Sequence, residues 1–140
     1  LFQEQHVSKV YHCIAAVPSS SQEQWLIQNR LVSTTEPHFL MQSIDGEAHA
    51  ESSIKILEHN ESYAKFELKP KSGKQHQLRL HMCEVSNGIL NDPWYPVLLD
   101  EQEQQGFERP MQLLAKELHF VDPLTGEKRS FISEQDLQVP

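Results

Sequence analysis

The sequence predicts a single α+β domain in which strands outnumber helices. Its 140 residues are one domain's worth of chain, and a hydrophobic content of 38% is enough for one modest core. Several segments alternate apolar and polar side chains, which is typical of half-buried strands, and one segment repeats apolar residues at helical spacing. The sequence contains no internal repeat and no low-complexity linker, so we expect residues 1–140 to form one domain.

Six segments have the alternation or composition of strands. They are residues 9–17, 25–31, 51–57, 63–68, 111–120 and 129–132. The third and fourth segments are separated by a short polar turn and therefore predict a β-hairpin. The fifth is a strand, or a strand with a short helical lead-in. Residues 32–46 are polar and poorly patterned, and we predict no element there.

Residues 74–86 form the one predicted helix. Leu78, Met82 and Val85 recur at helical spacing, and Asn87 with Gly88 favours an end to the helix. Ser72 and Gln75 have the spacing of a capping box, which would satisfy free amide groups at the start of the helix.

Charge is distributed unevenly along the chain. Twelve Lys and Arg residues against twenty Asp and Glu give a net charge of −8, which argues against a nucleic-acid partner. Residues 65–79, however, hold four lysines, Arg79 and only Glu67, so this window carries +4 and the rest of the chain −12. A basic cluster on an acidic body is the electrostatic footprint of a site for a phosphate-bearing ligand. The alternative is a solvated hairpin end with scattered lysines.

Several classes of protein lack their sequence signals here. The longest apolar runs are only a few residues, so we expect no transmembrane helix and no membrane partner. Cys13 and Cys83 cannot form a disulfide framework, which favours a reducing compartment, and we expect the cytoplasm. His76 and His81 are five residues apart and fall on different helix faces, and no cysteine pair has zinc-site spacing, so we expect no metal.

The segment from Lys71 to His81 carries the clearest chemistry. A strand ends, a turn at Gly73 follows, and the start of a helix lies beside two lysines. Exposed amide groups and the helix dipole favour an anion there. Arg79 lies one turn further along between two leucines, where a guanidinium is suited to fix a carboxylate or phosphate with two parallel hydrogen bonds. A structural ion pair explains its spacing equally well.

Four blocks of the sequence resemble the RluA family of pseudouridine synthases. KSGKQHQLRLHM (71–82) and NGILNDPWY (87–95) are similar to the family's Thr-Gly-Arg-x-His-Gln-Ile/Leu-Arg-x-His and Pro-Ile-Leu-Gly-Asp-x-x-Tyr signature. Lys9-Val-Tyr11 matches its Lys-x-Tyr, and residues 109–127 match its Leu-His-Ala-x-x-Leu-x-Phe block. Three departures are Ser72 for Thr, Asn91 for Gly and Leu114 for His. The resemblance implies an α+β fold with a mixed, mainly antiparallel sheet, flanking helices and a central RNA cleft.

The family's Arg-Leu-Asp segment, which carries its catalytic aspartate, precedes Lys-x-Tyr and has no match in these residues. We therefore expect the chain to be the carboxy-terminal portion of one catalytic domain, truncated at its amino terminus. The 140-residue chain alone is then expected to be inactive. Asp92 matches a structural turn aspartate of the family and not its nucleophile.

The resemblance also implies an activity and a set of site residues. The activity is isomerisation of uridine to pseudouridine in rRNA or tRNA, without a cofactor, on a base flipped out of its stack. Tyr11 would stack on the flipped uracil and assist proton removal, and Arg79 would pair with the missing aspartate. Leu113 or Leu114 would line the base pocket. Residues that would contact RNA or brace the site wall are Lys9, Lys71, Lys74, His76 and Gln77.

Two other hypotheses fit the same residues. The chain could be a non-catalytic RNA-binding remnant of such a domain, or an unrelated α+β interaction domain. Loss of the first part of the domain would expose an apolar sheet face and an unpaired strand edge, so we expect either a dimer through that face or a fragment taken from a longer chain.

Overall fold

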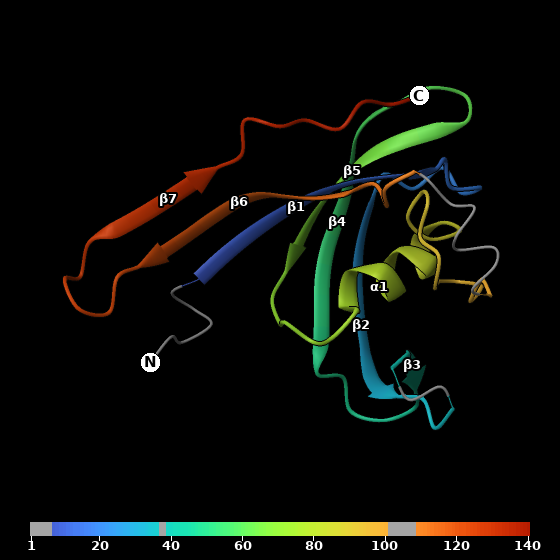
Figure 1. Ribbon diagram of the computed structural model, residues 1–140, viewed down its shortest axis with the longest axis horizontal. Coiled ribbons are helices and arrows are strands. Elements are labelled where there is room, and N and C mark those ends of the chain that lie inside the picture. Colours follow the sequence, from blue (N-terminus) through green and yellow to red (C-terminus); the bar gives the residue numbers. More distant parts are fainter. Residues whose placement is uncertain (1–6, 37–38, 101–108) are drawn as a thin grey trace.

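The computed structural model describes residues 7–36, 39–100 and 109–140. They form one seven-stranded sheet in the order β3-β2-β4-β5-β1-β6-β7, with the single helix α1 against one of its faces (Figure 1). Every strand pair in this part of the chain is antiparallel. The strands are β1 (Val7–Ala16), β2 (Gln24–Ser33), β3 (Met41–Ile44), β4 (Ala50–His59), β5 (Tyr63–Pro70), β6 (Leu113–Val121) and β7 (Lys128–Ile132). The α+β prediction is confirmed.

The core lies between the helix and the middle of the sheet. On β1, Cys13 and Ala15 point to the helix side because alternate residues of a strand share a face. Their β5 partners Phe66 and Ala64 are fully buried beside them. The predicted apolar stripe of the helix, from Leu78 to Val85, packs onto this surface.

Helix α1 (Gln77–Val85) begins later than the sequence predicts. The backbone of His76 is left-handed, with φ 57°, so helical geometry cannot extend back to residue 74. The predicted capping box is wrong, because no side chain caps this end of the helix. The Ser72 hydroxyl instead accepts a hydrogen bond from Glu51 N–H (3.0 Å) and donates one to Gln77 Oε1 (2.7 Å). Ser72 therefore ties the loop before the helix to β4.

The strand prediction missed β3, which pairs with β2 within the stretch judged to lack pattern. Three of its four residues are exposed, so the burial that produces a readable alternation is absent.

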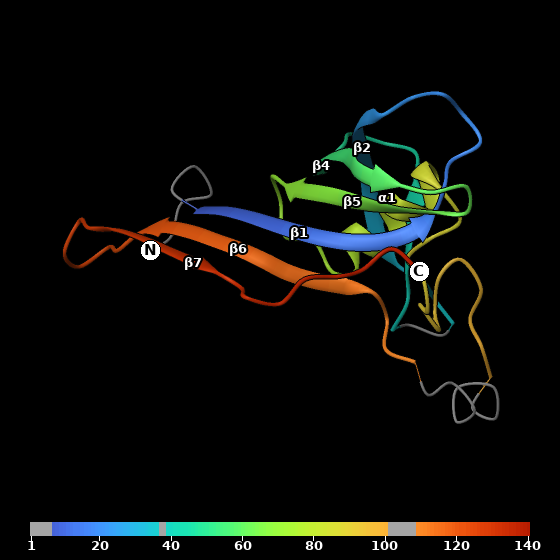
Figure 2. The same cartoon turned by 90° about the horizontal axis from the view of Figure 1, so that it is seen from above.

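On the opposite side of the sheet from α1, the chain after β7 runs back along β1 and β6 (Figure 2). Lys116 Nζ holds it there by donating to Ser133 O (2.8 Å), Gln135 O (2.7 Å) and the Asp136 carboxylate (2.8 Å). No helix in the described part of the chain is long and apolar enough to cross a membrane.

A buried hydrogen-bond network fixes the helix on the sheet. Asn29 Nδ2 donates to Glu84, so its Oδ1 accepts from His81 Nε2–H (2.9 Å). His81 Nδ1 then accepts from the Ser52 hydroxyl (2.8 Å), whose oxygen accepts from Gln77 Nε2 (2.9 Å). His81 is fully buried, and burial lowers its pKa to about 4. The neutral imidazole is therefore part of the folded structure, and it links α1 to β2 and β4.

This network predicts that the chain loses stability in acid. The folded pKa of His81 lies below its ordinary value of 6.5, so its contribution is complete above pH 6.5 and is lost as the pH falls toward 4. The free energy of unfolding should fall by about 3 kcal/mol over that range from this group. Urea denaturation at several pH values measures it. In His81→Gln the fall should be much smaller, whereas in the control His119→Gln, whose side chain is 36% exposed, it should persist.

An equally steep fall in His81→Gln would contradict this assignment. Some slope should remain in that variant, because burial also lowers the pKa values of His12 and His76.

Candidate functional site

A hollow of about 310 Å³ lies where β1, the loop before α1, the start of α1 and β6 meet. Seven of the nine site residues that the sequence predicts line it. These are Lys9, Tyr11, Lys74, His76, Gln77, Arg79 and Leu113. Three separate sequence blocks supply them, so the fold brings together residues that the chain holds far apart.

Each wall of the hollow follows from local structure. Lys9 and Tyr11 are two apart on β1 and therefore share a face of the sheet. Leu113 lies opposite Cys13 at the start of β6, next to the same face. Leu114 follows it on the strand and points to the other face, so of the two predicted base-pocket residues only Leu113 lines the hollow.

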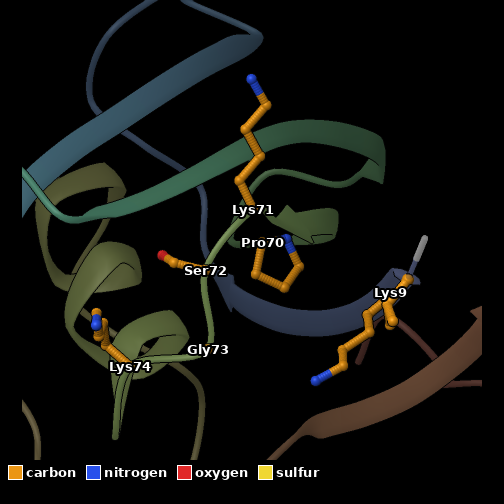
Figure 3. A pocket seen from close by; sticks show the side chains of 7 residues that line it. Lys9, Pro70, Lys71, Ser72, Gly73 and Lys74 are labelled. Atoms are coloured by element: carbon orange, nitrogen blue, oxygen red, sulfur yellow. The ribbon is translucent and has the colours of Figure 1, made fainter. Parts of the chain in front are cut away.

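A second hollow, of about 360 Å³, adjoins the first and shares with it Lys9, Lys74 and the loop between β5 and α1 (Figure 3). We call the two together the basic groove. Lys71 lines its outer part, but its Nζ lies 3.1 Å from the Glu51 carboxylate and its side chain is 79% exposed. Within the described residues, Lys9 and Lys74 have no such acidic partner. The unpaired positive charge of the groove therefore belongs mainly to Lys9 and Lys74.

Gln77 and His76 brace the wall of the hollow. Gln77 is buried, and its amide donates to Glu51 O and to the Ser52 hydroxyl, both at 2.9 Å. Met41 N–H donates to the Tyr95 hydroxyl oxygen (2.8 Å), so Tyr95 O–H donates in turn to His76 Nδ1 (2.7 Å). Burial, with the nearby charge of Arg79, lowers the pKa of His76, so near neutral pH this ring supplies no positive charge for a phosphate.

Arg79 forms a buried ion pair with Asp92. Its Nε donates to Asp92 Oδ2 (2.9 Å) and its Nη2 to Oδ1 (2.6 Å). The side chains are 14% and 0% exposed, respectively. The structural ion pair that the spacing allows is therefore present. Pairing of Arg79 with an aspartate from elsewhere stays a prediction, although the residue does line the same hollow as Tyr11.

The sequence did not predict that three neighbouring residues hold the Arg79 guanidinium. Asp92 holds the guanidinium, while the Trp94 and Tyr95 rings lie with their centroids 4.7 and 5.2 Å from Arg79 Cζ. The signal was the NDPWY block itself, an aspartate closely followed by two aromatic residues. The family resemblance assigns that aspartate only to a turn.

In the described part of the chain, no group of three or more His, Cys, Asp and Glu side chains converges as a metal site would require. Cys83 lies one helical turn after Arg79, and its Sγ–H donates to the backbone carbonyl of Arg79 (3.3 Å). Burial and nearby carboxylates raise the pKa of this thiol to about 11, so it is protonated and weakly nucleophilic.

The sequence model of the RNA pseudouridylate synthase family matches residues 1–84. The chain belongs to this family. The tRNA pseudouridine synthase C of Vibrio vulnificus is 37% identical over 76 residues, which cover 53% of this chain and 31% of that protein. The dual-specificity RNA pseudouridine synthase RluA of Haemophilus influenzae is 35% identical over 69 residues, or 49% of this chain and 30% of that protein. The predicted RluA-type resemblance is thus confirmed.

Solved structures give the same fold. The human RNA pseudouridylate synthase domain containing 1 matches with a TM-score of 0.71 and 20% identity, over 94% of this chain and 56% of that one. The human RNA pseudouridylate synthase domain containing 4 matches with a TM-score of 0.65 and 22% identity, over 95% of this chain and 59% of that one. The chain spans about a third of the length of the curated relatives and a little over half of these two structures.

The buried ion pair makes a prediction about stability. In Arg79→Met the Asp92 carboxylate loses its cation while remaining buried, which should lower the free energy of unfolding by about 3 kcal/mol or more. Arg79→Met combined with Asp92→Asn should recover at least half of that loss, because no buried charge then remains. Urea denaturation followed by tryptophan fluorescence measures both.

Arg129→Met is the matched control, since Arg129 is half exposed and its Nε lies 3.8 Å from Asp122. It should cost well under 1 kcal/mol. Equal losses in Arg79→Met and Arg129→Met would show that the Arg79 pair is not held as described.

Proposed function

We propose that this protein is an RNA pseudouridine synthase, which isomerises uridine to pseudouridine in structured RNA. The observation that carries the proposal is the hollow that joins Tyr11 to Arg79 at one end of a basic groove, in a chain of this family. An RNA phosphate fits the groove, and a flipped base fits the hollow. We propose tRNA or rRNA as the substrate, since relatives are named for tRNA and for dual specificity.

In the proposed reaction each residue of the site has its own role. RNA binding places phosphates near Lys9 and Lys74, with Lys71 at the outer end, and the target uridine leaves its stack. An aspartate attacks the nucleotide and the glycosidic bond breaks. The uracil turns and bonds to the sugar through carbon 5 as the aspartate is released, and the proton lost from carbon 5 is balanced by one gained at N1. Tyr11 stacks on the uracil and assists removal of the proton from carbon 5, and Leu113 packs against the base. Arg79 pairs with the aspartate and keeps it ionised.

We propose that the attacking aspartate comes from outside these 140 residues. Asp92 is the acid next to Arg79, but its side chain is fully enclosed and cannot reach a substrate. Its oxygens already accept hydrogen bonds from the guanidinium and from the backbone N–H groups of Trp94 (2.9 Å) and Tyr95 (3.3 Å).

The expected dimer is a separate proposal. Large apolar side chains are exposed at the β7 edge, where Phe131 is 59% and Ile132 63% exposed. A strand edge of this kind favours pairing with another chain.

Arg79→Ala, in the protein produced from its complete reading frame, should abolish pseudouridine formation and leave RNA affinity within about threefold of wild type. The guanidinium is engaged with carboxylates in the proposed mechanism, so its loss removes chemistry and not phosphate contacts. Product is measured by tritium release from uridine labelled at carbon 5, and affinity by filter binding. The 140-residue chain alone serves as the reference without product.

A proportional loss of product and affinity in Arg79→Ala would make Arg79 a phosphate contact. Turnover by the 140-residue chain alone would overturn the assignment of the nucleophile. A complete protein that binds RNA and yields no product would favour the non-catalytic remnant.

The basic groove predicts a specific salt dependence of RNA binding. Lys9→Ala with Lys74→Ala should weaken binding and make the slope of log K against log salt concentration shallower by about 1 to 2, because each lysine displaces a counterion from the RNA. The matched control is Lys55→Ala with Lys69→Ala, two lysines that each lie 3.6 Å from Glu67 on a different part of the sheet. An unchanged slope in the first pair, or equal changes in both pairs, would contradict the proposed RNA path.

A further inference from the structure

The guanidinium of Arg79 is held from three sides by one short loop. The Asp92 carboxylate binds its Nε and Nη2 edge, and the rings of Trp94 and Tyr95 lie near Cζ. We propose that Asp92 is a positioning residue, which fixes Arg79 so that its remaining edge presents N–H donors to the hollow for a second carboxylate. This inference rests on the proposed function. It adds Asp92 to the site and assigns one edge of the Arg79 guanidinium to Asp92 and the other edge to the ligand.

The hydrogen-bond pattern divides the guanidinium into two edges. Arg has five N–H donors in a planar fork, and the Asp92 pair uses one at Nε and one at Nη2. In the described residues, Nη1 has no hydrogen-bond partner. A carboxylate can therefore bind across Nη1 and Nη2 without displacing Asp92.

Asp92 is itself immobile, as a positioning residue must be. Besides two donors from Arg79 it accepts the N–H groups of Trp94 (2.9 Å) and Tyr95 (3.3 Å), two and three residues further on. This turn fixes the carboxylate relative to both rings. Since Asp92 does not line the hollow, it acts on anything bound there only through Arg79.

The ring of Tyr95 is anchored in turn. Its hydroxyl accepts from Met41 N–H on β3 (2.8 Å) and donates to His76 Nδ1 (2.7 Å), and the residue is buried. The loop that holds Arg79 is therefore tied both to the edge of the sheet and to the residue before α1. Donors held this way cost no reorganisation when an anion arrives.

The test compares Asp92→Asn with Asp122→Asn in the protein from the complete reading frame. Asp122 is the matched control, because it also accepts a backbone N–H two residues on (2.9 Å, Leu124) and lies near an arginine, but on the β6–β7 hairpin. The rate constant is measured in a single turnover with protein in excess, and the RNA Kd separately. We expect Asp92→Asn to lower the rate constant at least tenfold with Kd changed less than threefold, and Asp122→Asn to leave both within twofold.

A double-mutant cycle asks whether Asp92 acts through Arg79. In an Arg79→Lys background, which has lost the two-edged fork, Asp92→Asn should cost less than threefold in rate. An unchanged rate in Asp92→Asn, a proportional loss of rate and affinity, or the same cost in both backgrounds would each overturn the inference.

A measurement that needs no activity separates this inference from the proposed function. In ¹⁵N-labelled wild-type protein the Arg79 Nη signals should be resolved, because rotation of the guanidinium is restricted. They should merge in Asp92→Asn, and signals that stay resolved would overturn the inference. A wild-type protein that makes no pseudouridine from tRNA or rRNA would remove the proposed function, while this spectrum would still decide whether Asp92 holds Arg79.

Discussion

The ion pair between Arg79 and Asp92 joins the first turn of α1 to the loop after it, and the candidate site is built around it. Replacing a buried ion pair by apolar residues of similar volume is often neutral or stabilising, so stability alone does not explain why this pair is present. The pair does hold a cation at the wall of an open hollow, 14% exposed, with its counterion fully enclosed behind it. A guanidinium that binds a ligand explains this arrangement better than a guanidinium that only joins two segments of the chain.

The direction of Arg79 depends on where α1 begins. His76, with its left-handed backbone, ends the loop, and the buried Gln77 amide fixes the first helical residue to Glu51 and Ser52 on β4. His81, one turn later, repeats the attachment through Ser52. Two polar anchors on one side of the helix leave little freedom for rotation about its axis. Arg79, between them in sequence, is therefore directed toward β1 and the loop by contacts it does not itself make.

The sequence predicted those parts of the fold in which local pattern and burial agree. Six strands were found because their residues either alternate apolar and polar, as in residues 51–57, or have a strand-like composition, as in residues 9–17. The four-residue edge strand β3 was missed since little of it is buried. The capping box at Ser72 failed because β4 and Gln77 compete for the same hydroxyl. Clustering of the site residues followed from the family motif, but the Arg79–Asp92 contact depends on how a loop returns across thirteen positions, and the NDPWY block marks only a turn there.

Charge pairing distinguishes Arg79 from the two lysines of the basic groove. Asp92 compensates Arg79 in the wall of the hollow, while the exposed Lys9 and Lys74 have no acidic partner within the described residues. A polyanion is therefore attracted to the two lysines more than to Arg79, whereas a neutral base can enter the hollow without meeting an uncompensated charge. The same compensation weakens the pull of Arg79 on any second anion, so that binding there relies on the direction of its free N–H groups more than on net charge. That selects for a planar carboxylate at a fixed position and against a mobile phosphate.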